Sequence, residues 1–296
     1  MKRIVLSFAT GASQYRTMAK ALGLSLRLHG SQATRVLMTD QPGDPELQAT
    51  WDQLIPPTPG YSHWFLKLSA LEATDADQIL FVDGDSLAVG NIDPIFDHLA
   101  GSDFAVQGRW ERDPGDWYGD FRAAMDRTGV DQAPKFSGGF LYYENTDRAR
   151  VLLREINQLK EGYDDLGLRR NGGHVVDEVC ISLAMAKTQI GRVVPDSANY
   201  SLTPWRRNGR LNLDVLRGEC SFYRSMPEPE IARPLLYHSA RAKWDLDYWR
   251  QVRVLIRLLR HARTPFMEQT PSARIRQKLA RVAVEVYRKL CLPDDR

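Results

Sequence analysis

The sequence predicts an α/β fold in which helices flank a mixed, mostly parallel sheet. Short apolar runs typical of buried strands cover Ile4–Phe8, Thr34–Asp40 and Ile79–Val82. Apolar residues at helical spacing separate these runs, over Tyr15–Leu28 and over residues 63–77. Alternating strands and helices are typical of a parallel sheet, because parallel neighbours must be joined by a crossover connection.

The middle of the chain is less regular but favours the same class. A short helix is expected over Asn91–Leu99, with Asp93 as its N-cap. A strand is expected over Phe140–Tyr143, followed by a helix whose N-cap is Thr146 or Asp147. These elements extend the predicted sheet and its helical layers.

The bulk composition is that of a globular protein in water. The chain has 296 residues, of which 43% are hydrophobic and 26% charged, enough for one large α/β domain. Its first residues resemble a strand more than a signal peptide, and no window approaches the roughly 20 apolar residues of a membrane-spanning helix. Neither a disulfide framework nor a zinc site is expected from three widely spaced cysteines, Cys180, Cys220 and Cys291. The expected location is the cytoplasm.

The charge is divided unevenly along the chain. Residues 250–296 hold 12 Lys/Arg and 4 Asp/Glu, a net charge of +8, whereas residues 1–249, with 28 basic and 33 acidic residues, carry −5. We therefore divide the sequence into a main domain, 1–249, and a basic amphipathic helical tail, 250–296. The first helix of the tail has an apolar face, formed by Val252, Leu255, Ile256 and Leu259. Its opposite face is basic and is formed by Arg250, Arg253, Arg257 and Arg260.

Two interpretations of the tail stay open. Arg-rich amphipathic helices suit the anionic surface of a membrane, where the protein would be peripheral. Alternatively, the apolar faces bury Leu255 and Leu279 against the main domain while the arginines face water. A nucleic-acid partner is not expected, because the tail has few interleaved aromatic residues and the main domain is acidic.

Two aspartates, Asp83 and Asp85, follow the apolar run Ile79–Val82 directly. Residues two apart in an extended chain point to the same side, so both carboxylates are expected to face one space at the strand's carboxyl end. That edge is where open α/β sheets bind ligands. Two hard oxygen donors there suit a divalent cation, and Gly84 between them allows a close backbone approach. The alternative is a turn with two solvated carboxylates.

Five segments in a fixed order carry a resemblance to a known family. They are "SFATGASQY", "FLKLSALEATDADQILFVDGDSLAVGNIDPIF", "FSGGFLYYENTD", "VVDEVC" and "YHSARAKW". On these segments, which span roughly Ile4–Trp249, the chain resembles the GT-A-fold glycosyltransferases that use nucleotide sugars. Among these glycosyltransferases, the chain is most similar in layout to the group of glycogenin and bacterial lipooligosaccharide galactosyltransferases.

The resemblance implies a function and a cofactor. The function is transfer of a sugar from a nucleotide diphosphate sugar, with UDP-hexose expected, to a glycan or lipid-linked acceptor in bacterial surface polysaccharide synthesis. The cofactor is Mn²⁺ (or Mg²⁺), which Asp83, Asp85 and His238 would bind. A neutral imidazole beside two carboxylates suits such a cation.

The resemblance also assigns donor-binding and catalytic residues. Asp177 and Glu178 fall beside the reacting carbon of the donor sugar. The implied donor-binding residues are Ala9, Thr10, Tyr15, Lys67, Asp83, Gly84 and Lys243. Asp177 and Glu178 also fit the acidic first turn of a helix, where they complement its macrodipole.

The chain departs from the family pattern in ways that leave the chemistry open. The spacing from His238 to Lys243 is one residue short, "FSGG" lacks the asparagine usual in that strand, and Glu178 replaces a glutamine. The order of the motifs favours a retaining transferase, in which the leaving phosphate takes the acceptor's proton. The alternatives are an inverting transferase with Asp177 or Glu178 as general base, and an Asp-X-Asp phosphatase or phosphotransferase.

Overall fold

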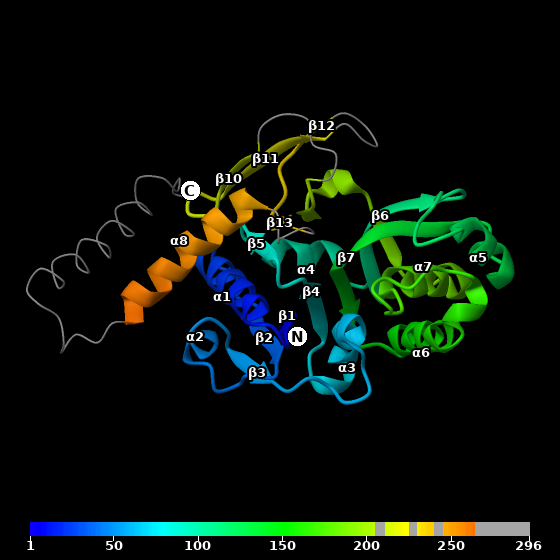
Figure 1. Ribbon diagram of the computed structural model, residues 1–296, viewed down its shortest axis with the longest axis horizontal. Coiled ribbons are helices and arrows are strands. Elements are labelled where there is room, and N and C mark those ends of the chain that lie inside the picture. The colour runs from blue at the N-terminus through cyan, green and yellow to red at the C-terminus, as the bar shows by residue number, and fades with distance from the viewer. Residues whose placement is uncertain (205–210, 225–229, 240–244, 264–296) are drawn as a thin grey trace, which may run out of the picture.

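The computed structural model describes residues 1–204, 211–224, 230–239 and 245–263. Its centre is a seven-stranded sheet with the strand order β3-β2-β1-β4-β7-β6-β8 (Figure 1). Four neighbouring pairs are parallel, and β7 is antiparallel to both β4 and β6. The predicted mixed, mostly parallel sheet is confirmed. The strands are β1 (Arg3–Ala9), β2 (Thr34–Thr39), β3 (Gln53–Ile55), β4 (Gln78–Val82), β6 (Phe104–Glu111), β7 (Ala133–Glu144) and β8 (Arg192–Val194).

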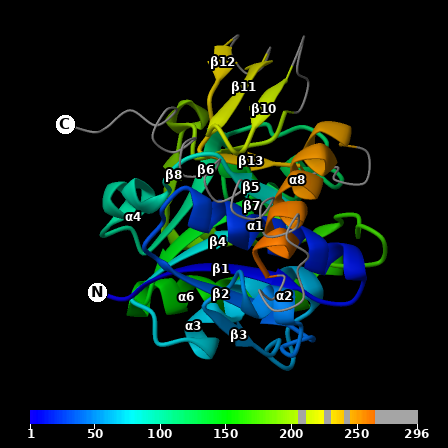
Figure 2. The same cartoon turned by 90° about the vertical axis from the view of Figure 1, so that its left-hand side faces the viewer.

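Helices cover both faces of this sheet, as Figures 1 and 2 show from two sides. Alternate strand residues enter opposite layers: Ile4 and Leu6 join the core under α5, α6 and α7, and Val5 joins the core under α1 and α4. The helices are α1 (Ser13–Leu28), α2 (Pro45–Gln48), η1 (His63–Ser69), α3 (Ala70–Ala73), α4 (Asp93–Leu99), α5 (Phe121–Thr128), α6 (Asp147–Glu161), η2 (Tyr163–Leu166), α7 (Asp177–Thr188), η3 (Asp196–Ala198) and α8 (Leu246–Arg263).

Two of the predicted helices differ in detail from the sequence predictions. Ile92, not Asp93, occupies the N-cap of α4, because the Asp93 carboxylate accepts hydrogen bonds from the Ser31 hydroxyl and the Gln32 amide instead. The helix expected over residues 63–77 is a 3₁₀ segment followed by one α-helical turn. The Tyr143 hydroxyl donates to the carbonyl of Lys67, a tertiary contact that continuous helical periodicity does not reveal.

Two three-stranded sheets lie beyond the carboxyl edge of the central strands. In one, β13 is antiparallel to β5 and parallel to β9; in the other, β11 lies between β10 and β12. Their strands are β5 (Ser86–Ala88), β9 (Ser201–Leu202), β10 (Asn212–Asp214), β11 (Glu219–Arg224), β12 (Glu230–Ala232) and β13 (Leu236–His238). The small sheets bring late segments of the chain to the end of β4.

The boundary predicted at residues 249 and 250 falls inside α8. Three residues of the apolar face expected for this helix, Val252, Leu255 and Ile256, are buried in a cluster with Met18 and Ala21 of α1 and Phe222 of β11, and Leu259 is buried as well. The residues of the basic face, Arg250, Arg253, Arg257 and Arg260, are exposed. Residues 246–263 therefore pack against the main domain, as one of the two interpretations expects. The rest of the predicted tail, 264–296, lies outside the described residues.

Across the described ranges, every helix is too short or too polar to cross a bilayer. Two of the three cysteines, Cys180 and Cys220, are buried free thiols. Cys291 is outside the described residues.

Candidate active site

The two aspartates of the first motif meet through a turn. β4 ends at Val82, and the amide of Ser86 donates to the carbonyl of Asp83 over 3.0 Å, which closes the turn before β5 begins. The expectation that an extended backbone aligns Asp83 and Asp85 is therefore wrong, although their carboxylates do converge. Their side chains are 27% and 24% exposed, so the solvated turn is not what the structure shows either.

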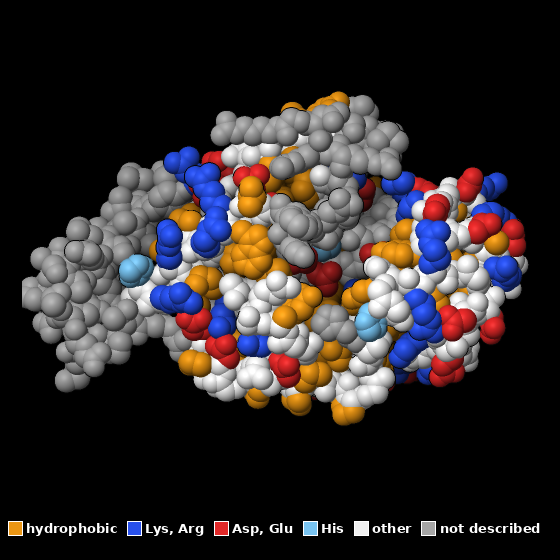
Figure 3. All heavy atoms as spheres, viewed as in Figure 1, with side chains coloured by type: hydrophobic (Ala, Val, Ile, Leu, Met, Phe, Trp, Pro, Cys, Tyr) orange, Lys and Arg blue, Asp and Glu red, His pale blue; other side chains and the backbone are white. Residues whose placement is uncertain are grey.

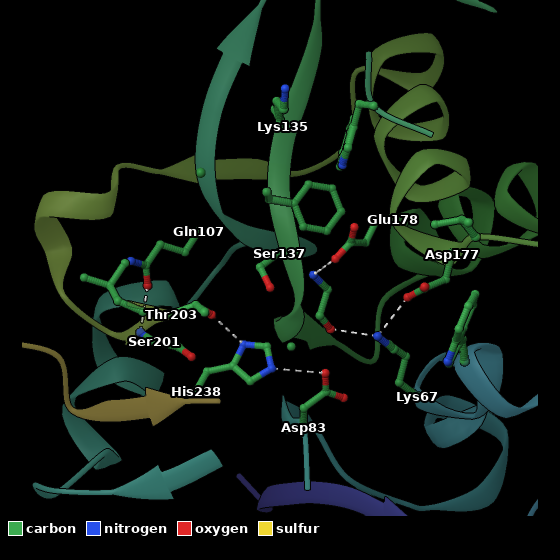
Figure 4. Close-up of a pocket in the computed structure, with 18 of the residues that line it drawn as sticks. Lys67, Asp83, Gln107, Lys135, Ser137, Asp177, Glu178, Ser201, Thr203 and His238 are labelled. Atoms are coloured by element: carbon green, nitrogen blue, oxygen red, sulfur yellow. Dashed lines mark hydrogen bonds and ion pairs between the residues drawn. The ribbon is translucent and has the colours of Figure 1, made fainter. Parts of the chain in front are cut away.

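His238 reaches this turn because β13 pairs with β5. In the antiparallel register His238 lies opposite Ser86, and the amide of Ser239 donates to the carbonyl of Asp85 over 3.1 Å. The His238 Nε2 atom lies 3.2 Å from Asp85 Oδ1 and 3.6 Å from Asp83 Oδ2 (Figure 4). A pairing of strands about 150 residues apart in sequence thus assembles the three predicted metal ligands.

The ring of His238 is held in one orientation. Its Nδ1 atom is 3.1 Å from the hydroxyl of Thr203, which directs Nε2 toward the aspartates. On its other side the ring lies against Gly139 of β7, where an added Cβ would come within 2.3 Å of it. A larger residue at position 139 would have to displace the imidazole.

These three side chains fit a divalent cation. One ligand atom from each lies within 4.8 Å of the others. Burial and the charge of Asp85 raise the pKa of Asp83 to about 6, even though Lys67 acts to lower it. Burial acts to lower the pKa of His238, but Asp85 and Asp83 outweigh it and raise that pKa. Two carboxylates and an imidazole that converge on one space form a suitable donor set for Mn²⁺ or Mg²⁺.

A second carboxylate pair lies in the same cavity and has a cation from the chain itself. Asp177 and Glu178 form the first turn of α7, and Lys67 Nζ lies 2.8 Å from Asp177 Oδ2. Lys67 is 4% exposed and also donates to the carbonyl of Gly138 over 2.7 Å. Burial acts to lower the Lys67 pKa, but Asp177 and Asp83 raise it above its ordinary value, so the ammonium stays charged.

No Lys or Arg of the described ranges forms an ion pair with Glu178, whereas Lys67 pairs with Asp177. Its carboxylate accepts a hydrogen bond of 2.7 Å from the amide of Gly138, and Tyr118 lines the same cavity. Burial, followed by the charge of Asp177, raises the pKa of Glu178 to about 7. The carboxyl group can therefore gain or lose a proton near neutral pH.

A cavity of about 640 Å³ joins both carboxylate pairs. Figure 3 shows acidic side chains at the bottom of a hollow in the middle of one face. Other parts of the chain contribute Trp64, Gln107, Trp117, Asn171 and Arg224 to its walls. The cavity lies at the carboxyl end of β4, where α/β sheets bind ligands.

Comparison with known proteins identifies the fold that carries this cavity. No protein-family model and no curated protein matches the chain. Among solved structures, galactosyltransferase LgtC in complex with donor and acceptor sugar analogues matches with a TM-score of 0.54 and 12% identity, over 90% of this chain and 98% of that chain. The chain has the GT-A glycosyltransferase fold.

Two further structures support the same fold. Mouse xyloside xylosyltransferase 1 matches with a TM-score of 0.51 and 14% identity, over 81% of this chain and 98% of that chain. The glycosyltransferase GlyE of Streptococcus pneumoniae matches with a TM-score of 0.51 and 15% identity, over 91% of this chain and 66% of that chain. At these identities the likeness shows the GT-A fold alone.

The GT-A cavity brings together six of the residues predicted from sequence: Lys67, Asp83, Asp85, Asp177, Glu178 and His238. Gly84, Ala9, Thr10 and Tyr15 are not among its lining residues. Ala9 is fully buried in the core, and Gly84 lies against β1, where an added Cβ would be 3.2 Å from the carbonyl of Phe8. Lys243 lies outside the described residues.

Three contributors to the site escaped the sequence interpretation. An added Cβ at Gly138 would lie 3.0 Å from Glu178 and 3.1 Å from Lys67 Nζ. The two glycines of "FSGG" therefore leave space for these side chains and for the His238 ring. That pair was a visible signal. The second contributor is Tyr118, whose φ of 58° is a left-handed conformation that costs a non-glycine residue about 1–3 kcal/mol. The third is Thr203, which is distant in sequence from its partner, His238. Neither had a local signal.

Proposed function

We propose that this protein is a metal-dependent glycosyltransferase that uses a nucleotide diphosphate sugar, with UDP-hexose as the expected donor. The observation that carries the proposal is one cavity with two unlike carboxylate pairs. Asp83 and Asp85 converge with His238 and have the donor set of a divalent cation, whereas Asp177 and Glu178 adjoin the chain's own cation, Lys67. The GT-A fold, and a neighbour bound to donor and acceptor sugar analogues, support the same function.

The residues divide the reaction between them. Asp83, Asp85 and His238 would hold Mn²⁺ or Mg²⁺, which when bound supplies Lewis-acid stabilisation of a leaving diphosphate. Lys243 would add a second positive charge there, and Thr10, Tyr15 and Gly84 would contact the nucleotide, whereas Ala9 is fully buried and would not. Lys67 forms an ion pair with Asp177 and holds its side chain in place. Asp177 and Glu178 would then stabilise the positive charge that develops on the sugar ring in the transition state.

The stereochemical outcome depends on which group takes the proton of the acceptor hydroxyl. The order of the motifs favours retention, with a phosphate oxygen as the acceptor of that proton. An inverting enzyme would use a carboxylate as general base, and a pKa of about 7 suits Glu178 to that role. NMR of the freshly formed product, which reads the anomeric configuration directly, separates the two.

The test is turnover of a panel of nucleotide sugars with Mn²⁺, for the native protein, Asp83→Asn and Asp85→Asn. Each variant should lose about 100-fold or more of its turnover while its circular dichroism stays native, because the donor set loses one of two carboxylates. The exposed Asp164→Asn serves as the control and should remain active. Full activity in either site variant, or in excess chelator, contradicts the proposal; metal-dependent phosphate release from simple phosphate esters would favour the phosphatase instead.

We extend the proposal to the acceptor and its location. A glycan or lipid-linked acceptor, as in surface polysaccharide synthesis, would bring the protein to an anionic membrane surface. Exposed arginines on α8, at positions 250, 253 and 257, support this, and Figure 3 shows Lys and Arg side chains gathered over that helix. Each basic residue near such a surface adds about 1 kcal/mol.

Changing these three arginines together to glutamine should weaken sedimentation with anionic vesicles at low salt. The same change at Arg148, Arg150 and Arg154, which are exposed on α6, is the matched control. This design keeps the buried face of α8, which truncation after Trp249 would remove. If the full-length protein ignores anionic vesicles at low salt, membrane binding is wrong.

A further inference from the structure

Strand β7 connects the metal-ligand cluster to the opposite end of the cavity. Residues 135–139 of this strand all line the cavity. Gly139 lies under His238, and Gly138 lies against Glu178 and Lys67. At about 3.3 Å per residue, the backbone of Lys135 is roughly 13 Å along the strand from Gly139. Figure 4 shows Lys135 at the end of the pocket away from Asp83 and His238.

Lys135 is held at this end by neutral groups. Its ammonium donates to the carbonyl of Pro114 and lies 5.9 Å from the centre of the Trp117 ring. Trp117 is fixed in turn against Phe121 and Phe136, with ring centres 5.1 Å and 6.1 Å away. The position of the charge is therefore set before any ligand arrives, which reduces the ordering cost of binding.

The cations of the cavity differ in their partners. Lys67 pairs with Asp177, and Arg224 pairs with Asp196 and Glu230. Lys135 is half-buried, and none of the carboxylates in the described ranges forms an ion pair with it. Its neighbour across the β6–β7 ladder, Arg109, also lines the cavity and pairs with Glu111. This end of the cavity thus holds a positioned positive charge that has no ion pair with a carboxylate of the described residues.

We propose that Lys135, beside Trp117, forms a subsite for an anionic group on the acceptor, either a carboxylate or a phosphate ester. The inference rests on the proposed function and specifies its substrate class. The diphosphate of the donor belongs beside Asp83 and Asp85, and the length of β7 leaves room for the donor sugar before Lys135. An ammonium with two N–H donors beyond the Pro114 contact is suited to an anion at this position.

Binding of small acceptor analogues to the full chain tests the inference without relying on turnover. Methyl glucuronide, a hexose phosphate and the neutral methyl glucoside are titrated by calorimetry, with and without UDP and Mn²⁺. At least one anionic analogue should bind about tenfold or more tightly than the neutral one, the scale of one charge-assisted hydrogen bond. Comparing the glucuronide with the phosphate distinguishes the two sources of charge.

Variants locate the effect. Lys135→Met should abolish the preference for the anion and leave UDP binding unchanged, and Lys135→Arg should retain it. Lys160→Met is the matched control, because Lys160 also lies over an aromatic ring, that of Phe65 at 4.9 Å, but does not line the cavity. Equal affinities for all three analogues in the native protein, or an undiminished preference in Lys135→Met, overturn the inference. If the native protein prefers the anionic analogue but does not bind UDP in the presence of Mn²⁺, the proposed function is contradicted and this inference is not.

Discussion

The negative charges of the two carboxylate pairs in the cavity are balanced in different ways. Asp177 is almost fully buried and has Lys67 within 2.8 Å, so the fold itself supplies the counter-charge. Asp83 and Asp85 are about a quarter exposed, and the side chain beside both is His238, an imidazole that carries a charge only when protonated. The first pair is complete in the folded chain. The second suits a cation from solution, and its partial exposure gives that cation access.

The largest expected effect comes from removing the internal cation. Lys67→Met leaves Asp177 buried without its partner, which typically costs about 3–5 kcal/mol of folding free energy. Urea denaturation should show this loss. Lys67→Arg, the matched control, keeps the charge and should retain more stability. A Lys67→Met protein as stable as the native one would mean that Asp177 does not depend on an internal counter-charge.

A smaller effect is expected at the metal-ligand cluster. Gly139→Ala places a methyl group against the His238 ring, at a spacing of 2.3 Å before relaxation, and should displace the imidazole from the aspartates. Loss of such orienting contacts weakens metal affinity by about 10–100-fold. Calorimetric titration with Mn²⁺ measures it, and Gly43→Ala, whose added Cβ meets nothing within 4 Å, is the control. Unchanged Mn²⁺ affinity in Gly139→Ala would mean that His238 is not a ligand of the metal.

The mildest test concerns Glu178, which lies in the same buried region but, among the described residues, has no ion pair like that of Asp177 with Lys67. Its pKa rises from 4.5 to about 7 on folding, mainly because of burial, so the folded state binds the proton more tightly than the unfolded chain. This contribution to stability is present below about pH 4.5 and is lost as the pH rises through about 7. Glu178→Gln should flatten that part of the pH profile of thermal unfolding in chelator. Identical profiles for the two proteins would contradict the assignment; the exposed Glu161→Gln is the control.

Much of the fold was predictable because its information is local. Apolar runs and helical spacing report which face of an element is buried, and they located β1, β2, β4, α1 and the apolar face of α8. The same reasoning identified Asp83 and Asp85 as a pair at a strand end, although a turn rather than strand alternation aligns them. For α8 the pattern alone could not distinguish a membrane surface from the main domain, because both accept an apolar face.

The sequence by itself determined the hydrophobic layers, the acidic motif after β4 and the acidic first turn of α7, since each depends on neighbours within a few residues. Only the tertiary structure decided which of these groups meet. His238 joins the aspartates through the pairing of β13 with β5, Lys67 reaches Asp177 from another element, and Gly138 and Gly139 leave the space for both. Such contacts depend on which strands become neighbours, and periodicity within one element carries no record of that choice.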